Sequence, residues 1–166
     1  MNRFTHTLKF IATCAVFSWA SGPIYAQTVK IDGAWVRTAV QGQKGTGGFM
    51  KLTADQDLQL VSITSPVAGV GEVHEMKMEG DVMKMRALPA GIALPAGKTI
   101  ELKPGGFHVM LLDLKQALPI DSTVPMTLVF KNKAGKEMKM ELKVPVATRA
   151  PGAGPAAKEM DHSMHK

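Results

Sequence analysis

The clearest pattern in the chain is a strict alternation of apolar and charged residues over residues 137–144. Met138, Met140, Leu142 and Val144 hold the even positions, and Glu or Lys holds every odd position. Because successive side chains of a strand point to opposite faces, this pattern predicts a strand with one buried face. Segments rich in Val, Leu, Ile, Thr and Met predict further strands at residues 29–37, 48–52, 57–65, 73–78, 82–88, 99–102, 109–112 and 123–130.

Glycine and proline recur about every ten residues between these segments, and helical signals are weak. Regular turn spacing of this kind is typical of an all-β fold, and we expect a single antiparallel β-sandwich domain over residues 27–148. Residues 150–157 then read Ala-Pro-Gly-Ala-Gly-Pro-Ala-Ala. This composition predicts a flexible linker, so residues 149–166 are expected to form a disordered C-terminal tail.

The first 26 residues predict a secretory signal peptide. Arg3 and Lys9 precede an apolar stretch that is too short to span a bilayer comfortably, and a cleavage point follows at Ala26. An uncleaved anchor is the alternative. Lipid attachment at Cys14 is not favoured, because Thr13 precedes it where a small residue is expected. We therefore expect export to the periplasm, with no membrane insertion of the mature chain.

The charge of the mature chain gives little support to nucleic-acid binding. The whole chain has 20 basic and 14 acidic residues, of which two basic ones leave with the signal peptide, so the mature net charge is +4. The lysines alternate with apolar residues along the predicted strands, which is typical of a solvated face. Cys14 is the only cysteine, so the mature chain has neither a disulfide nor a thiol ligand for a metal.

Methionine and histidine repeatedly lie close together in the sequence. Eleven of the twelve methionines lie in the mature chain, and each mature histidine has a methionine within two residues. These histidines are His74, His108, His162 and His165. Pairing of two rare residue types at four places requires an explanation.

The first such place, residues 74–85, predicts a β-hairpin. With Glu79-Gly80 as a two-residue loop, residue i faces residue 159 − i, so His74 faces Met85 and Met76 faces Met83. Directly opposed residues have Cβ atoms about 4.5–5.5 Å apart. One imidazole and several thioethers are therefore expected on one face of the hairpin, with the basic residues on the other.

The second place is the pair His108 and Met110, which share a face if they lie on a strand. Together with His74 and Met85 they offer two imidazole nitrogens and two thioether sulfurs. Thioethers are soft, neutral ligands that suit Cu(I) and are poor ligands for Zn(II), Ca(II) or Mg(II). We expect loop 103–107 and the Glu79-Gly80 turn to frame this site at one end of the sandwich. The alternative is core packing, which is our interpretation of Met50, Met126, Met138 and Met140.

The tail contains the other two histidines. Met160, His162, Met164 and His165 lie in a polar segment together with Glu159 and Asp161. Imidazoles beside carboxylates suit Cu(II), so the tail is a possible Cu(II) site. The alternative is a chain end with no function.

The chain resembles the PCuAC family of periplasmic copper chaperones. The resemblance rests on Gly33-Ala34-Trp35-Val36-Arg37 and on residues 73–78, 82–86, 95–97 and 102–111, and His74 and Met85 enclose ten residues as in the family motif. It implies a cupredoxin-like sandwich in which His74, Met85, His108 and Met110 bind Cu(I), while Met76, Met78 and Met83 support the site or assist transfer. Met83 is the alternative to Met85 as ligand.

The resemblance also implies delivery of Cu(I) toward the binuclear centre of cytochrome c oxidase, alongside a Sco-type thiol protein. A copper-storage or resistance protein is the alternative, because the same ligands could retain the metal. A blue-copper electron carrier would require a cysteine thiolate, which the mature chain lacks. No serine has a nucleophile motif around it, so we do not expect an enzyme. We expect a binding protein that is a monomer.

Overall fold

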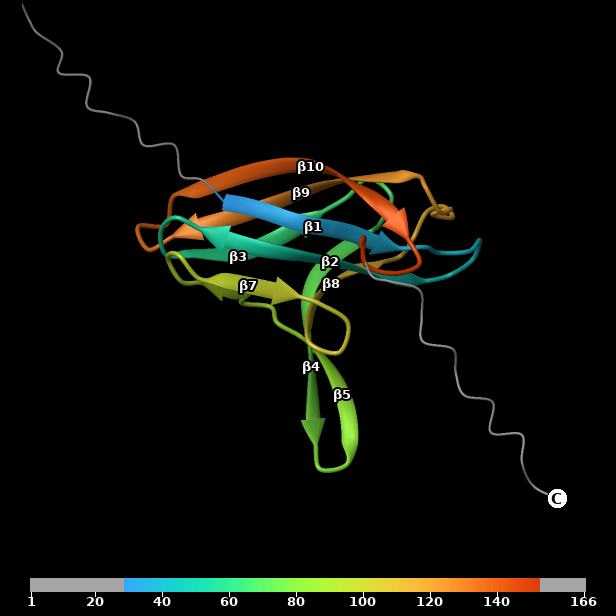
Figure 1. Cartoon of the computed structure of the whole chain (residues 1–166), viewed down its shortest axis with the longest axis horizontal. Coiled ribbons are helices and arrows are strands. Elements are labelled where there is room, and N and C mark those ends of the chain that lie inside the picture. The colour runs from blue at the N-terminus through green and yellow to red at the C-terminus, as the bar shows by residue number, and fades with distance from the viewer. Residues whose placement is uncertain (1–28, 153–166) are drawn as a thin grey trace, which may run out of the picture.

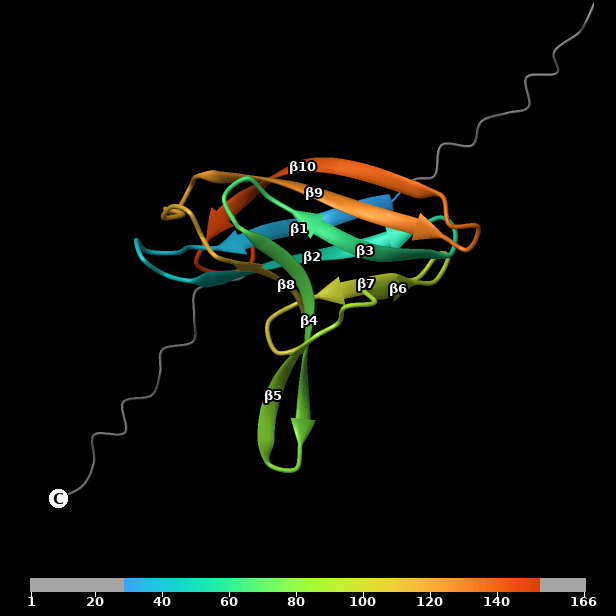
Figure 2. The same cartoon turned by 180° about the vertical axis from the view of Figure 1, so that it is seen from behind.

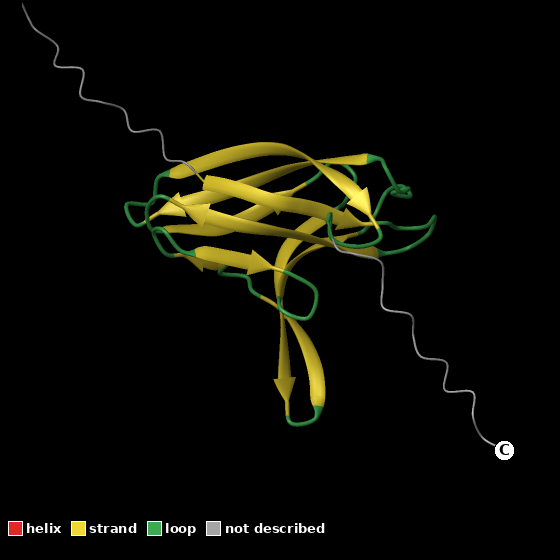
Figure 3. Cartoon of the chain, viewed as in Figure 1, coloured by secondary structure: helices red, strands yellow, loops and turns green. Residues whose placement is uncertain are grey.

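The computed structural model describes residues 29–152, and these contain ten strands and no helix (Figures 1 and 3). Within these residues no helix could cross a bilayer. The signal peptide, Cys14 and the tail histidines lie outside the described residues. The strands are β1 (Val29–Arg37), β2 (Gly45–Ala54), β3 (Leu58–Thr64), β4 (Val70–Glu79), β5 (Val82–Ala87), β6 (Ile92–Leu94), β7 (Thr99–Leu102), β8 (Phe107–Leu112), β9 (Thr123–Asn132) and β10 (Glu137–Ala147).

All nine predicted strands are present, and β1 and β7 have the predicted bounds. Strand β6 was not predicted, because its three residues lie between Gly91 and Pro95 and are too few to show a period. β6 forms by pairing with β3, where Leu94 is opposite Leu58. The all-β prediction is therefore confirmed.

The strands wrap around one core. The sheet order is β5-β4-β8-β2-β1-β10-β9-β3-β6, with β7 paired to β2, and β4 pairs with β3 as well as β8. Seven strands from β4 to β3 thus form a closed, flattened ring. The expectation of purely antiparallel pairing is wrong at one place, since β1 and β10 are parallel. No short turn joins these first and last strands, so nothing forces them to run in opposite directions.

The buried faces fill the core with aliphatic and aromatic side chains, among them Leu52, Leu60 and Phe130. Met50 and Met126 are buried there as predicted. Met138 and Met140 are partly buried and pack against this core. These four methionines are therefore structural, which leaves the methionines of β4, β5 and β8 to be explained otherwise.

The β4–β5 hairpin projects from the body of the domain (Figures 1 and 2). Its register differs from the prediction: Glu79 is opposite Val82, Met76 is opposite Met85, and Ala87 is opposite His74. The predicted pairs His74–Met85 and Met76–Met83 are therefore wrong. The loop is Gly80-Asp81, and Gly80 adopts a φ of 63°, which glycine accommodates without a Cβ clash. The shift is by two residues, so the predicted faces are kept.

Candidate metal site

Two histidine rings lie side by side on neighbouring strands. His74 on β4 is directly opposite His108 on β8, and the centroids of the two rings are 5.8 Å apart. His108 is only 5% exposed. Val73 and Val109, which alternate with these histidines, are buried in the core and hold the two strands together. Core packing on one face thus fixes the imidazole pair on the other.

In each ring, one nitrogen donates a hydrogen bond and the other does not. The Nδ1 of His108 donates to the Gly106 carbonyl at 3.0 Å, because a carbonyl can only accept. The Nε2 of His74 donates to the Glu72 carboxylate at 2.8 Å. The neutral rings therefore carry lone pairs on His108 Nε2 and His74 Nδ1. The latter atom is buried without a hydrogen-bond partner. An unsatisfied buried nitrogen requires an explanation, and a bound metal ion would provide one.

A cavity of about 290 Å³ opens beside His108. Three thioethers line it, from Met76, Met85 and Met110. Met76 and Met85 are opposite one another across the hairpin. His74 does not line the cavity itself, but it lies directly opposite His108, which does. The site thus combines soft sulfur atoms with imidazole nitrogens that have free lone pairs.

The other predicted residues lie farther out. Met83 is opposite Met78, one pair nearer the hairpin tip, and neither lines the cavity. Pro104 and Gly105 do line it, so the predicted loop lies at the cavity. The prediction that the turn also frames the site is wrong. β4 continues for five residues beyond His74, so the turn lies at the tip of the hairpin.

The loop before β8 is fastened to the site by one carbonyl group. The Gly106 carbonyl accepts from the Met76 backbone N–H at 3.1 Å as well as from the His108 ring. It therefore ties the base of the hairpin, the loop and an imidazole together. This arrangement limits the movement of His108 Nε2 relative to Met76.

An aromatic and cationic stack that the sequence pattern did not predict lies beside the site. The rings of Phe49 and Trp35 are 4.5 Å apart, and Phe49 lies 6.4 Å from the His108 ring. The Arg37 guanidinium carbon is 5.5 Å from the Phe49 centroid, and Arg37 lines the cavity. The i, i+2 spacing of Trp35 and Arg37 on a strand was the only available signal. The stack supports His108 from the side opposite the hairpin.

Gly47 makes room for this stack, which leads to a stability prediction. A Cβ on Gly47 would lie 2.7 Å from the Phe49 Cζ atom. Because Phe49 is buried against Trp35, Gly47→Ala is expected to lower the free energy of unfolding by about 1–3 kcal/mol, as overpacking does. Urea denaturation measures it. In a Phe49→Leu background the same change should cost much less, and equal costs in the two backgrounds would contradict the explanation.

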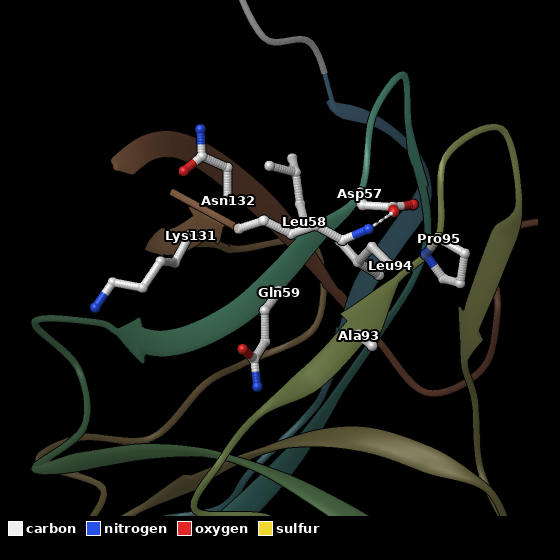
Figure 4. Close-up of a pocket in the computed structure, with 9 residues that line it drawn as sticks. Asp57, Leu58, Gln59, Ala93, Leu94, Pro95, Lys131 and Asn132 are labelled. Carbon is white, nitrogen blue, oxygen red and sulfur yellow. Dashed lines mark ion pairs between the residues drawn. The ribbon is translucent and has the colours of Figure 1, made fainter. Parts of the chain in front are cut away.

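A larger hollow of about 390 Å³ lies at the edge formed by β3, β6 and β9 (Figure 4). It is lined by polar and aliphatic groups, with no imidazole or sulfur. A side-chain hydrogen bond from Lys133 lowers the pKa of Asp57, and the Ala96 backbone N–H, which also donates to this carboxylate, adds to the effect. Among the described residues, no three His, Cys, Asp or Glu side chains gather as a metal cluster. Of these two cavities, only the one beside His108 therefore offers imidazole and thioether ligands for a soft metal.

The LpqE-like family, described as "Putative lipoprotein LpqE-like", matches residues 29–146, which is more than two thirds of the chain. The chain belongs to this LpqE-like, PCuAC-type family. A relative from Leifsonia xyli subsp. xyli (strain CTCB07), "Putative lipoprotein Lxx21020", is 30% identical over 144 residues, covering 80% of this chain and 87% of the relative. Both descriptions name lipoproteins, whereas the absence of lipid at Cys14 of this chain stays a prediction.

Solved structures of PCuAC-type proteins share the fold. The "Apo PCuAC domain from PmoF1" has a TM-score of 0.58 and 25% identity, covering 75% of this chain and 98% of that domain. The "Solution structure of CuI-DR1885 from Deinococcus Radiodurans" has a TM-score of 0.52 and 30% identity, covering 70% of this chain and 76% of that one. The cupredoxin-like, PCuAC-type fold of this LpqE-like chain is therefore shown.

Proposed function

We propose that this LpqE-like protein is an exported copper chaperone that binds Cu(I) through His74, His108, Met110 and Met85, with Met76 as an alternative sulfur ligand. The observation that carries the proposal is the pair of opposed histidines, each with a nitrogen lone pair, beside a cavity lined by three thioethers. A domain of this family described as CuI-DR1885 supports the choice of metal.

The chemistry of these ligands suits a transported Cu(I) ion. Thioethers are soft and carry no proton, so binding at the sulfur atoms releases no proton. No carboxylate lines the cavity, and Arg37 adds a positive charge at its wall. A divalent ion is therefore disfavoured relative to a monovalent one. Neutral ligands at an open cavity also permit exchange with an incoming thiolate, which is what release requires.

We further propose that the recipient is the copper centre of cytochrome c oxidase, reached in the periplasm together with a Sco-type thiol protein. The tail residues Met160, His162, Met164 and His165 are proposed as a separate Cu(II) site. Storage or resistance is the second candidate function, and the exposed position of the hairpin favours delivery over it. A storage site is expected to shield its metal from incoming ligands.

The deciding experiment loads the exported chain, residues 27–166, with one equivalent of Cu(I) without oxygen and adds a copper-free oxidase copper-centre domain. Delivery predicts that the recipient acquires copper, with or without the Sco-type protein, and storage predicts that the metal stays. A parallel titration with Cu(II) compares the chain with a variant in which His162 and His165 are alanine. Failure of the chain to bind Cu(I) in competition with a chromophoric chelator would refute the proposed function.

A further inference from the structure

The outer half of the β4–β5 hairpin exposes two methionines that are not part of the hydrophobic core. Met78 is 54% exposed and Met83 is 45% exposed. Every residue of β5 is exposed, and neither methionine packs against the hydrophobic core. Single exposed apolar residues are ordinary, but two thioethers directly opposed on a projecting ribbon gain no stability from burial. Their presence requires a reason other than packing.

The register places these two side chains as a second sulfur pair in line with the candidate metal site. Met78 is opposite Met83, and the next pair on the same face is Met76 and Met85, which line the cavity. Successive pairs on one face are two residues apart, or about 7 Å along the strand. Directly opposed Cβ atoms are about 4.5–5.5 Å apart, a spacing that two flexible thioether side chains can close around one ion.

The charges of the hairpin do not repel a monovalent cation from this face. Residues 74–87 contain three acidic and three basic residues, so the segment is neutral. On the reverse face, Lys84 pairs with Glu79 at 2.8 Å and Arg86 pairs with Glu75 at 2.9 Å. Lys84 and Arg86 are thus held away from the methionines by ion pairs, and Lys77, opposite Lys84, lies on the same reverse face.

We propose that Met78 and Met83 form an outer, weaker site for a soft monovalent cation, from which the ion exchanges with the inner His/Met site. This inference rests on the proposed function, since it makes the hairpin a path toward the cavity. The step is a ligand exchange: sulfur–metal bonds at the outer pair break as bonds to Met76 or Met85 form. The metal stays Cu(I), and no electron or proton is transferred.

The test follows the methionine methyl groups by NMR while Ag(I), a soft monovalent probe that resists oxidation, is added to the exported chain. With the first equivalent, the methyl signals of Met85 and Met110 are expected to shift. With further metal, the signals of Met78 and Met83 are expected to shift together with a common midpoint. In Met78→Leu, which keeps the apolar volume, the affinity reported by Met83 should fall by about tenfold or more.

A matched control is Met138→Leu with Met140→Leu, which removes two partly buried thioethers from β10 and should leave the Met83 shift unchanged. Signals of Met78 and Met83 that stay fixed in excess metal would overturn the outer site, as would an unaltered Met83 midpoint in Met78→Leu. Failure of the proposed function is distinguishable, because Met85 and Met110 would then not respond to the first equivalent. Tail methionines are followed separately in the same spectra.

Discussion

Replacing His108 with alanine is expected to weaken Cu(I) binding by at least about 100-fold, or about 2.7 kcal/mol. His108 is the histidine that lines the cavity, and its Nε2 lone pair is free because Nδ1 donates to Gly106. Without this nitrogen, His74 and the thioethers leave the proposed coordination shell one ligand short. Anaerobic competition with a chromophoric Cu(I) chelator measures the change.

His108→Asn separates loss of the ligand from damage to the fold. The asparagine amide can still donate toward the Gly106 carbonyl, but it has no atom equivalent to Nε2. We expect this variant to lose as much Cu(I) affinity as His108→Ala while unfolding at a denaturant concentration closer to that of the unaltered protein. Retention of affinity within about threefold in His108→Asn would remove His108 from the ligand set.

Gly91→Ala is expected to lower the free energy of unfolding by about 3 kcal/mol or more. Gly91 adopts a φ of 77°, which costs a residue with a Cβ about 1–2 kcal/mol. A Cβ at this position would also overlap the Leu60 carbonyl oxygen, which belongs to the backbone of β3. Either the turn at residues 88–91 or strand β3 must then move. Chemical denaturation of the two proteins measures the difference.

Gly97→Ala is the matched control for this variant. Gly97 has a similar φ of 69°, but nothing lies within 4 Å of a Cβ built there. Only the conformational cost applies, so we expect a loss of about 1 kcal/mol. Equal losses in Gly91→Ala and Gly97→Ala would show that the close approach to Leu60 has no energetic consequence.

The sequence by itself predicted every strand of the described residues except β6, and it predicted the face on which the hairpin methionines lie. Alternation over residues 137–144 and turn residues at regular spacing are local signals. The alternation predicted β10, and two other strands, β1 and β7, were predicted with their observed bounds. The shared face of Met76 and Met85 was also predictable, although the turn was misplaced. A register error of two residues does not change the face. The candidate histidines and methionines could therefore be named from their spacing, while the preference for Met85 over Met83 came from the resemblance to the PCuAC family.

Only the tertiary structure decided which of these residues meet. The pairing of His74 with His108 joins strands that are distant in the chain, and their alignment depends on core contacts such as Val73 with Val109. The parallel pairing of β1 with β10 and the stacking of Phe49 on Trp35 also depend on packing between separate strands. Which nitrogen of each ring keeps its lone pair depends on hydrogen bonds to Gly106 and Glu72. A local sequence pattern cannot specify such contacts, because they form only when separate strands pack around a common core.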